Sequence, residues 1–204
     1  MRLYYHPMSS NARRARMAAL QLDVQLELVL VDLAKGEQKS PEFLRMNPNG
    51  RVPVLDDDGF FLNESHAIMQ YLAVRTPGQQ LYPTAPQARA DVNRWLFWSA
   101  QHLQPAVSVL NWERAIKPFL GRGEADPKEV ARGEQLVTEC AGVLDAHLAG
   151  QEWVAQGSLT LADLALAATL MATERARLPV AEYANLQAWF SRVRELDAWK
   201  KTDF

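Results

Sequence analysis

The segment Asn63-Glu64-Ser65 places an amide, a carboxylate and a hydroxyl at the predicted start of a helix. A helix N-terminus carries unpaired N–H groups and a partial positive charge, and both suit a bound carboxylate. The competing interpretation is that Asn63 or Ser65 caps the helix and no ligand is involved. These residues are therefore the first candidates for anion binding.

The cysteine and histidine content limits the other chemistry that we expect. Cys140 is the single cysteine, so no intramolecular disulfide and no Cys-x-x-Cys pair can form. It lies on an apolar helical stripe, where we predict an inert core thiol. The four histidines, His6, His66, His102 and His147, lack the spacing of a metal motif such as His-Glu-x-x-His. We therefore predict no metal site.

The composition is that of an ordinary globular protein. The 204 residues include 22 basic and 24 acidic side chains, a net charge of -2 that argues against a nucleic-acid binder. Hydrophobic residues make up 48% and charged residues 23%, enough for a buried core. No uncharged apolar run approaches about 18 residues, and residues 1–7 lack the layout of a secretory signal. We expect a cytoplasmic protein that does not interact with membranes.

The first part of the chain mixes strands with helices. Leu3–Tyr5 and Gln25–Val31 are predicted strands, and Asn11–Leu22 between them is a predicted helix with small residues on one stripe. Strand, helix and strand then form a right-handed parallel unit. Three arginines lie mostly off the small-residue stripe, and we predict that they form a solvated face rather than an anion-binding cluster: Arg13, Arg14 and Arg16.

A hairpin and a further helix complete this part. After a short predicted helix at Pro41–Arg45, residues 47–50 (Asn-Pro-Asn-Gly) indicate a turn. The predicted strands Arg51–Leu55 and Phe60–Leu62 flank Asp-Asp-Asp-Gly and form an antiparallel hairpin. The next helix runs to about Val74, so the predicted order is β-α-β-α-β-β-α.

From residue 85 onward the pattern predicts helices only. One long helix carries a stripe that includes Ser99 and His102, with a kink expected at Pro105. A second helix begins near Asp126. Thr160 and Asp163 have capping-box spacing and open a nearly all-apolar helix, which we predict to be the most buried one.

Three features together resemble the cytosolic glutathione transferase (glutathione S-transferase) family across essentially the whole chain. They are residues 47–55 (Asn-Pro-Asn-Gly-Arg-Val-Pro-Val-Leu), residues 63–68 (Asn-Glu-Ser-His-Ala-Ile) and residues 160–163 (Thr-Leu-Ala-Asp). The resemblance implies an α/β, thioredoxin-like βαβαββα domain at 1–77 that binds glutathione. It also implies a linker at 78–84 and an all-α, helical-bundle domain at 85–204 that contributes the electrophile site.

The resemblance also implies how glutathione is held in the first domain. It implies a cis Val52-Pro53 bond, which would turn the Val52 N–H and C=O outward to pair with the extended peptide. The Ser65 N–H and hydroxyl would hold the γ-glutamyl carboxylate, and Glu64 would pair with the ammonium group.

Further residues are implied around the glycyl end and the sulfur. Gln38 and Lys39 fall where related sequences grip the glycyl carboxylate, and Lys39 is the better candidate because it is charged. Many family members place a Ser, Tyr or Cys that contacts the sulfur between the first strand and the first helix. Ser9 matches this position best, with Ser10 and Asn11 as close competitors.

The family's activity is transfer of an alkyl or aryl group to the glutathione sulfur, which implies an enzyme with glutathione as co-substrate and no metal. Met8 and Trp112 are weak candidates for the hydrophobic electrophile site. The family also suggests a homodimer with a role in detoxification. The same scaffold can instead host glutathione-dependent isomerisation or peroxide reduction, or act as a non-catalytic hydrophobic-ligand-binding or interaction protein.

Overall fold

The computed structural model describes residues 1–203, and its internal contacts divide the chain into two units. The first unit contains residues 1–82 together with residues 196–203, and the second contains residues 83–195. The first unit holds a four-stranded sheet with helices, and the second is helical. The predicted fold class, an α/β domain followed by an all-helical one, is therefore confirmed.

The sheet has the strand order β2-β1-β3-β4. Its strands are β1 (Arg2–Tyr5), β2 (Glu27–Leu30), β3 (Val54–Asp57) and β4 (Phe60–Leu62). β1 runs parallel to β2 and antiparallel to β3, and β3 and β4 form the predicted hairpin. The predicted start of β3 at Arg51 was wrong by three residues. At its other end β3 extends beyond the predicted Leu55 to Asp57, which pairs with Phe60. Only Asp58 and Gly59 therefore form the turn.

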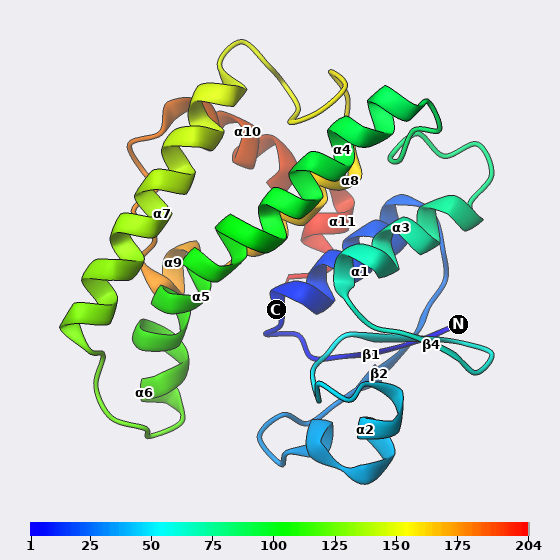
Figure 1. Cartoon of the computed structure of the whole chain (residues 1–204), viewed down its shortest axis with the longest axis horizontal. Coiled ribbons are helices and arrows are strands. Elements are labelled where there is room, and N and C mark those ends of the chain that lie inside the picture. Colours follow the sequence, from blue (N-terminus) through cyan, green and yellow to red (C-terminus); the bar gives the residue numbers. More distant parts are fainter. Residues whose placement is uncertain (204) are drawn as a thin grey trace. The chain divides into compact units, whose positions relative to one another are not determined.

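Helices cover the sheet of the first unit. They are α1 (Ser10–Gln21), α2 (Pro41–Met46), α3 (Ser65–Arg75), α11 (Asp197–Lys200) and a 3-10 turn (Glu37–Lys39). Tyr4 and Val54 pack with Phe43 of α2. Because side chains alternate along a strand, Leu3 and Leu55 face the other side of the sheet, and both are fully buried. α1 and α3 lie next to each other (Figure 1).

The predicted solvated face of α1 was wrong for two of its three arginines. Arg13 and Arg14 are only 2% and 1% exposed, and Arg16 is partly buried. α11 contacts α1, and there Arg13 donates to the Trp199 carbonyl oxygen at 3.0 Å with its guanidinium 3.7 Å from the centre of the Trp199 ring. Residues 196–203, which we expected in the helical domain, therefore pack with the first unit instead.

The second unit contains seven α-helices among its residues 83–195. They are α4 (Pro86–Trp98), α5 (Gln104–Asn111), α6 (Lys117–Phe119), α7 (Pro127–Leu148), α8 (Leu161–Leu170), α9 (Thr173–Ala176) and α10 (Ala184–Arg194). Figure 1 shows α4 continuing into α5, and a π-helical turn at Ser99–Leu103 joins them. This turn contains an extra residue, which shifts the buried stripe so that Leu103 is buried and the expected His102 is exposed.

α8 is buried along its whole length, as predicted. Thr160 and Asp163 form the predicted capping box: the Ala162 N–H donates to Thr160 Oγ1 at 3.3 Å, and the Thr160 N–H donates to Asp163 Oδ2 at 2.8 Å. Within residues 1–203, no helix is both long enough and apolar enough to cross a membrane.

Candidate functional site

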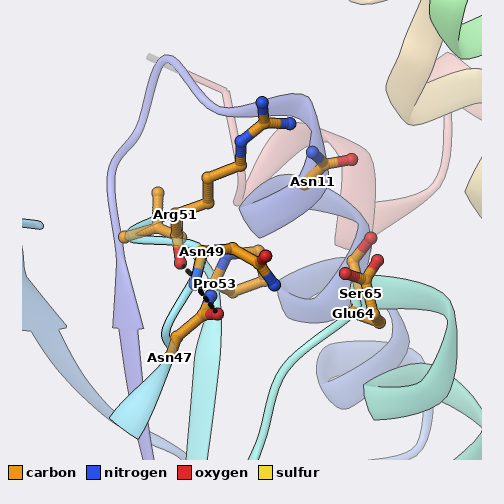
Figure 2. A pocket seen from close by; sticks show the side chains of 8 residues that line it. Asn11, Asn47, Asn49, Arg51, Pro53, Glu64 and Ser65 are labelled. Carbon is orange, nitrogen blue, oxygen red and sulfur yellow. Dashed lines mark hydrogen bonds between the residues drawn. The ribbon is translucent and has the colours of Figure 1, made fainter. Parts of the chain in front are cut away.

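The first unit contains a cavity of about 370 Å³. Its lining consists of Asn11, Asn47, Asn49, Arg51, Val52, Pro53, Glu64 and Ser65. In Figure 2 the start of α3 lies across the cavity from the loop before β3, and Asn11 comes from the first turn of α1. The fold therefore brings together three segments that are distant in sequence, two of which carry the motifs singled out above.

The loop before β3 is held by Asn47, which is buried. Its Nδ2 donates to the Arg51 carbonyl oxygen at 2.7 Å, and its Oδ1 accepts from the Asn49 N–H at 3.1 Å (Figure 2). Gly50 has φ +59°, in the left-handed region that glycine adopts most readily. The same geometry leaves no room for a side chain there, because a Cβ would lie 2.8 Å from the Gln38 carbonyl oxygen. The Asn47–Gly50 motif thus builds one wall of the cavity.

The Val52-Pro53 peptide bond that follows this turn is cis, which confirms the prediction. Val52 lies outside the paired residues of β1 and β3. Its main-chain N–H and C=O make no backbone hydrogen bond within the described part of the chain. Both groups therefore remain able to pair with an extended peptide.

The start of α3 departs from ordinary capping. Glu64 has φ +66°, and no side chain of the described residues caps the helix by a hydrogen bond, so the alternative of a cap by Asn63 or Ser65 is wrong. A non-glycine residue in this region is strained, and such strain concentrates at functional sites. Ser65 is only 5% exposed, and its Oγ accepts a hydrogen bond from Arg14 Nη1 at 2.7 Å. The first N–H groups of α3 are thus not occupied by a side-chain cap.

The loop between β1 and α1 separates its three candidates. Ser9 is the N-cap of α1, where its Oγ accepts from the Ala12 N–H at 3.2 Å. Ser10 is the first residue of the helix. Asn11 lines the cavity. Ser9 and Ser10, which precede Asn11 in the chain, are partly exposed but are not part of the lining. A capping serine still has its own O–H available as a donor.

The remaining candidates lie away from the cavity lining. Lys39 Nζ donates to the Asn49 carbonyl oxygen at 3.3 Å, next to the cavity-lining loop. Gln38 carries a buried Oε1 that has no hydrogen-bond partner among residues 1–203. Met8 belongs to the first unit and Trp112 to the second, and each is 37% exposed.

The sequence analysis preferred a solvated face for Arg14 over a role in anion binding, and the structure places it at the site instead. Arg14 Nη1 donates both to Ser65 Oγ and to Asn11 Oδ1, the latter at 2.8 Å, so its guanidinium joins two cavity-lining residues. Burial lowers its pKa to about 9, while the negative charge of Glu64 acts in the opposite direction, so Arg14 is cationic at neutral pH. Burial, together with the charge of Arg14, lowers the pKa of His66 far below its ordinary value. His66 is therefore neutral.

The sequence also gave no indication of the lining roles of Asn47, Asn49 and Arg51. These residues were recognised only as a turn and the start of a strand. A turn motif marks where the backbone reverses and does not reveal which of its side chains border a cavity.

Cys140 lies in α7 of the second unit and is half-buried. Burial raises the pKa of its thiol, and the charge of Glu139 acts in the same direction, so the thiol stays protonated at neutral pH. Among residues 1–203, no group of three or more His, Cys, Asp and Glu side chains is arranged to hold a metal ion.

The fold and the cavity define a class of protein: a thioredoxin-like sheet domain that carries a polar, peptide-sized cavity, followed by an all-helical domain. Residues 1–74 match the family model "Glutathione S-transferase, N-terminal domain", and residues 103–197 match "Glutathione S-transferase, C-terminal domain". The chain belongs to the glutathione S-transferase family.

Individual relatives cover nearly the whole chain. Glutathione S-transferase 3 of Zea mays is 34% identical over 99% of this chain and 92% of its own length. The solved structure of a delta-class glutathione transferase of Nilaparvata lugens has a TM-score of 0.86 and 34% identity, covering 99% of this chain and 92% of that one. A glutathione S-transferase-I solved with lactoylglutathione has a TM-score of 0.88 and 30% identity, covering 98% and 97% of the two chains.

Proposed function

We propose that this chain is a glutathione transferase that activates the thiol of glutathione for conjugation to a hydrophobic electrophile. The observation that carries the proposal is the placement of the Val52 main chain and the Glu64-Ser65 helix start on one cavity. An extended main chain and a helix N-terminus together complement a γ-glutamyl tripeptide, which has a peptide backbone and a carboxylate at its γ-glutamyl end.

The residues of the cavity have distinct roles in this proposal. Val52 pairs with the cysteinyl backbone of glutathione, and the Ser65 N–H and hydroxyl bind the γ-glutamyl carboxylate. Glu64 pairs with the ammonium group. Lys39, with Gln38 beside it, approaches the glycyl carboxylate from the neighbouring turn, since Lys39 already contacts the Asn49 carbonyl oxygen.

Thiol activation is assigned to the loop between β1 and α1. A free thiol with a pKa of about 8.5 is only a few per cent ionised at pH 7. A hydroxyl that donates to the sulfur favours the thiolate and lowers this pKa. Ser9 is the first candidate because its Oγ accepts from the Ala12 N–H and its proton remains available. Ser10 and Asn11 remain the competing candidates.

The proposal is tested by Ser9→Ala. We expect the bound thiol to have a pKa about one unit higher and turnover at neutral pH to fall about ten-fold, because one hydrogen bond to the anion is lost. The thiolate absorbance of the glutathione complex is titrated against pH, and rates are measured with aryl halides, epoxides, enals and peroxides. The enzyme should use one of the first three classes.

Cys140→Ser is the control and should leave both quantities unchanged, because the Cys140 thiol belongs to the second unit and is protonated. Wild-type protein without glutathione-dependent turnover on any of these substrates would contradict the transferase proposal. A silent Ser9→Ala with a severe Asn11→Ala would instead transfer the activating role to Asn11.

We also propose that the protein acts in the cytoplasm as a homodimer with a role in detoxification. Family membership supports this, and a two-fold pair is the commonest association of identical chains. We expect light scattering at micromolar concentration to give twice the mass of one chain. A mass of a single chain under these conditions would contradict the dimer without affecting the proposed chemistry.

A further inference from the structure

Arg14 has an unusual position for a charged side chain. It lies in α1, is 1% exposed, and bridges to α3 through Ser65 Oγ at 2.7 Å while also donating to Asn11 Oδ1 at 2.8 Å. Ser65 and Asn11 both line the cavity, whereas Arg14 itself does not. The guanidinium therefore lies directly behind two groups that a ligand in the cavity would meet.

The chemistry of the guanidinium fixes the direction of both hydrogen bonds. Arginine has five N–H donors and no acceptor, and it remains protonated at neutral pH. Ser65 Oγ must therefore accept from Arg14, which leaves the Ser65 O–H free to donate elsewhere. Asn11 must turn its Oδ1 toward Arg14, which directs its Nδ2 donors away from the guanidinium.

We propose that Arg14 is a positioning residue that makes Ser65 and Asn11 hydrogen-bond donors toward the cavity, so that the site selects ligands with an anion or a pure acceptor at these positions. The inference rests on the proposed function, in which glutathione is the ligand. The γ-glutamyl carboxylate then meets the Ser65 hydroxyl. A carboxamide has one acceptor oxygen where the carboxylate has two, so its NH2 group would face one of the two Ser65 donors, the N–H or the hydroxyl, and the analogue would bind poorly.

A purely structural role for Arg14 would have a different consequence. If the guanidinium only tied α1 to α3, its loss would weaken all ligands equally or destabilise the unit. If Arg14 instead sets the direction of the Ser65 hydrogen bond, its loss changes the preference between two ligands of nearly the same shape. Without Arg14, the Ser65 hydroxyl can accept a hydrogen bond from the ligand as well as donate one. The ratio of two affinities separates these roles, since it is insensitive to the fraction of folded protein.

The experiment compares glutathione with an analogue in which the γ-glutamyl α-carboxylate is replaced by a carboxamide. Calorimetry measures both affinities for wild type, Arg14→Met, Arg14→Gln and Ser65→Ala. We expect wild type to bind glutathione about 100-fold more tightly than the analogue. This ratio corresponds to losing one charge-assisted hydrogen bond and leaving its donor facing another donor. In both Arg14 variants this preference should be about ten-fold smaller than in wild type. In a Ser65→Ala background, Arg14→Met should not change the ratio further.

Arg16→Met is the matched control, because it removes the same charge from the same helix at a residue that donates to the Lys201 carbonyl oxygen and does not line the cavity. It should retain the wild-type ratio. Should Arg14→Met not fold, Arg14→Gln supplies the same comparison with a polar side chain.

Two outcomes overturn the inference alone: a wild-type ratio in a folded Arg14 variant, or a wild type that binds both ligands equally. If neither ligand binds wild-type protein at millimolar concentration, the proposed function falls and this inference with it. The two failures are therefore distinguishable.

Discussion

We expect Asp163→Ala to lower the free energy of unfolding of the helical unit by about 3–5 kcal/mol, because four buried donors lose their shared acceptor. Asp163 is 0% exposed. Its carboxylate accepts from the Val154 N–H at 2.9 Å, the Thr160 N–H at 2.8 Å, the Thr160 hydroxyl at 3.1 Å and Trp189 Nε1 at 2.9 Å. Alanine would leave these donors buried without an acceptor, which is more costly than losing the bonds themselves.

The measurement is chemical denaturation followed by circular dichroism at neutral pH. Asp163→Asn keeps one oxygen acceptor and nearly the same shape, so its loss should fall between wild type and alanine. Asp197→Ala is the control, because Asp197 is 83% exposed and forms a surface ion pair with Lys201. A change below about 1 kcal/mol for Asp163→Ala would show that the network can relax or admit water.

We expect Ser65→Ala to weaken glutathione binding about 100-fold, or about 2.7 kcal/mol. The hydroxyl serves two partners in the proposed complex: it accepts from buried Arg14 and donates to the γ-glutamyl carboxylate. Its removal takes a charge-assisted bond from the ligand and an acceptor from a desolvated guanidinium. The second loss is present without ligand as well, so it should also lower the stability of the first unit slightly.

Calorimetry with glutathione measures this effect, and thermal melting of the free protein separates binding from folding. Ser108→Ala serves as the control, because Ser108 is exposed in α5 of the other unit. An affinity within about three-fold of wild type would show that the carboxylate does not use this hydroxyl.

Several features of this protein depend on short stretches of sequence, and these are the ones that were predicted well. The capping box of Thr160 and Asp163 spans four residues, and the hairpin between β3 and β4 depends on one turn. The helix start at Ser65 follows from its flanking residues and the apolar run behind it. The family motif around Val52-Pro53 was sufficient to predict the cis bond.

The long α4–α5 helix shows where such patterns stop working. A period of 3.6 residues placed Ser99 and His102 on one buried stripe. Ser99 is buried as predicted, but the π turn at Ser99–Leu103 inserts a residue and buries Leu103 in place of His102. Regular periodicity predicts which face is buried only as long as the hydrogen-bond pattern of the helix stays regular.

The local sequence thus predicts the strands and helices, the turn and the helix start that carry this site, because each depends on contacts between near neighbours in the chain. The burial of Arg13 and Arg14 was decided by folding alone. Arg13 meets Trp199, 186 positions further along the chain, and Arg14 meets Ser65, 51 positions away. In the sequence both arginines look like residues of a solvated helix face. Their burial depends on a distant segment that covers the helix, because that segment both removes water from the charge and supplies the hydrogen-bond partners that offset this cost.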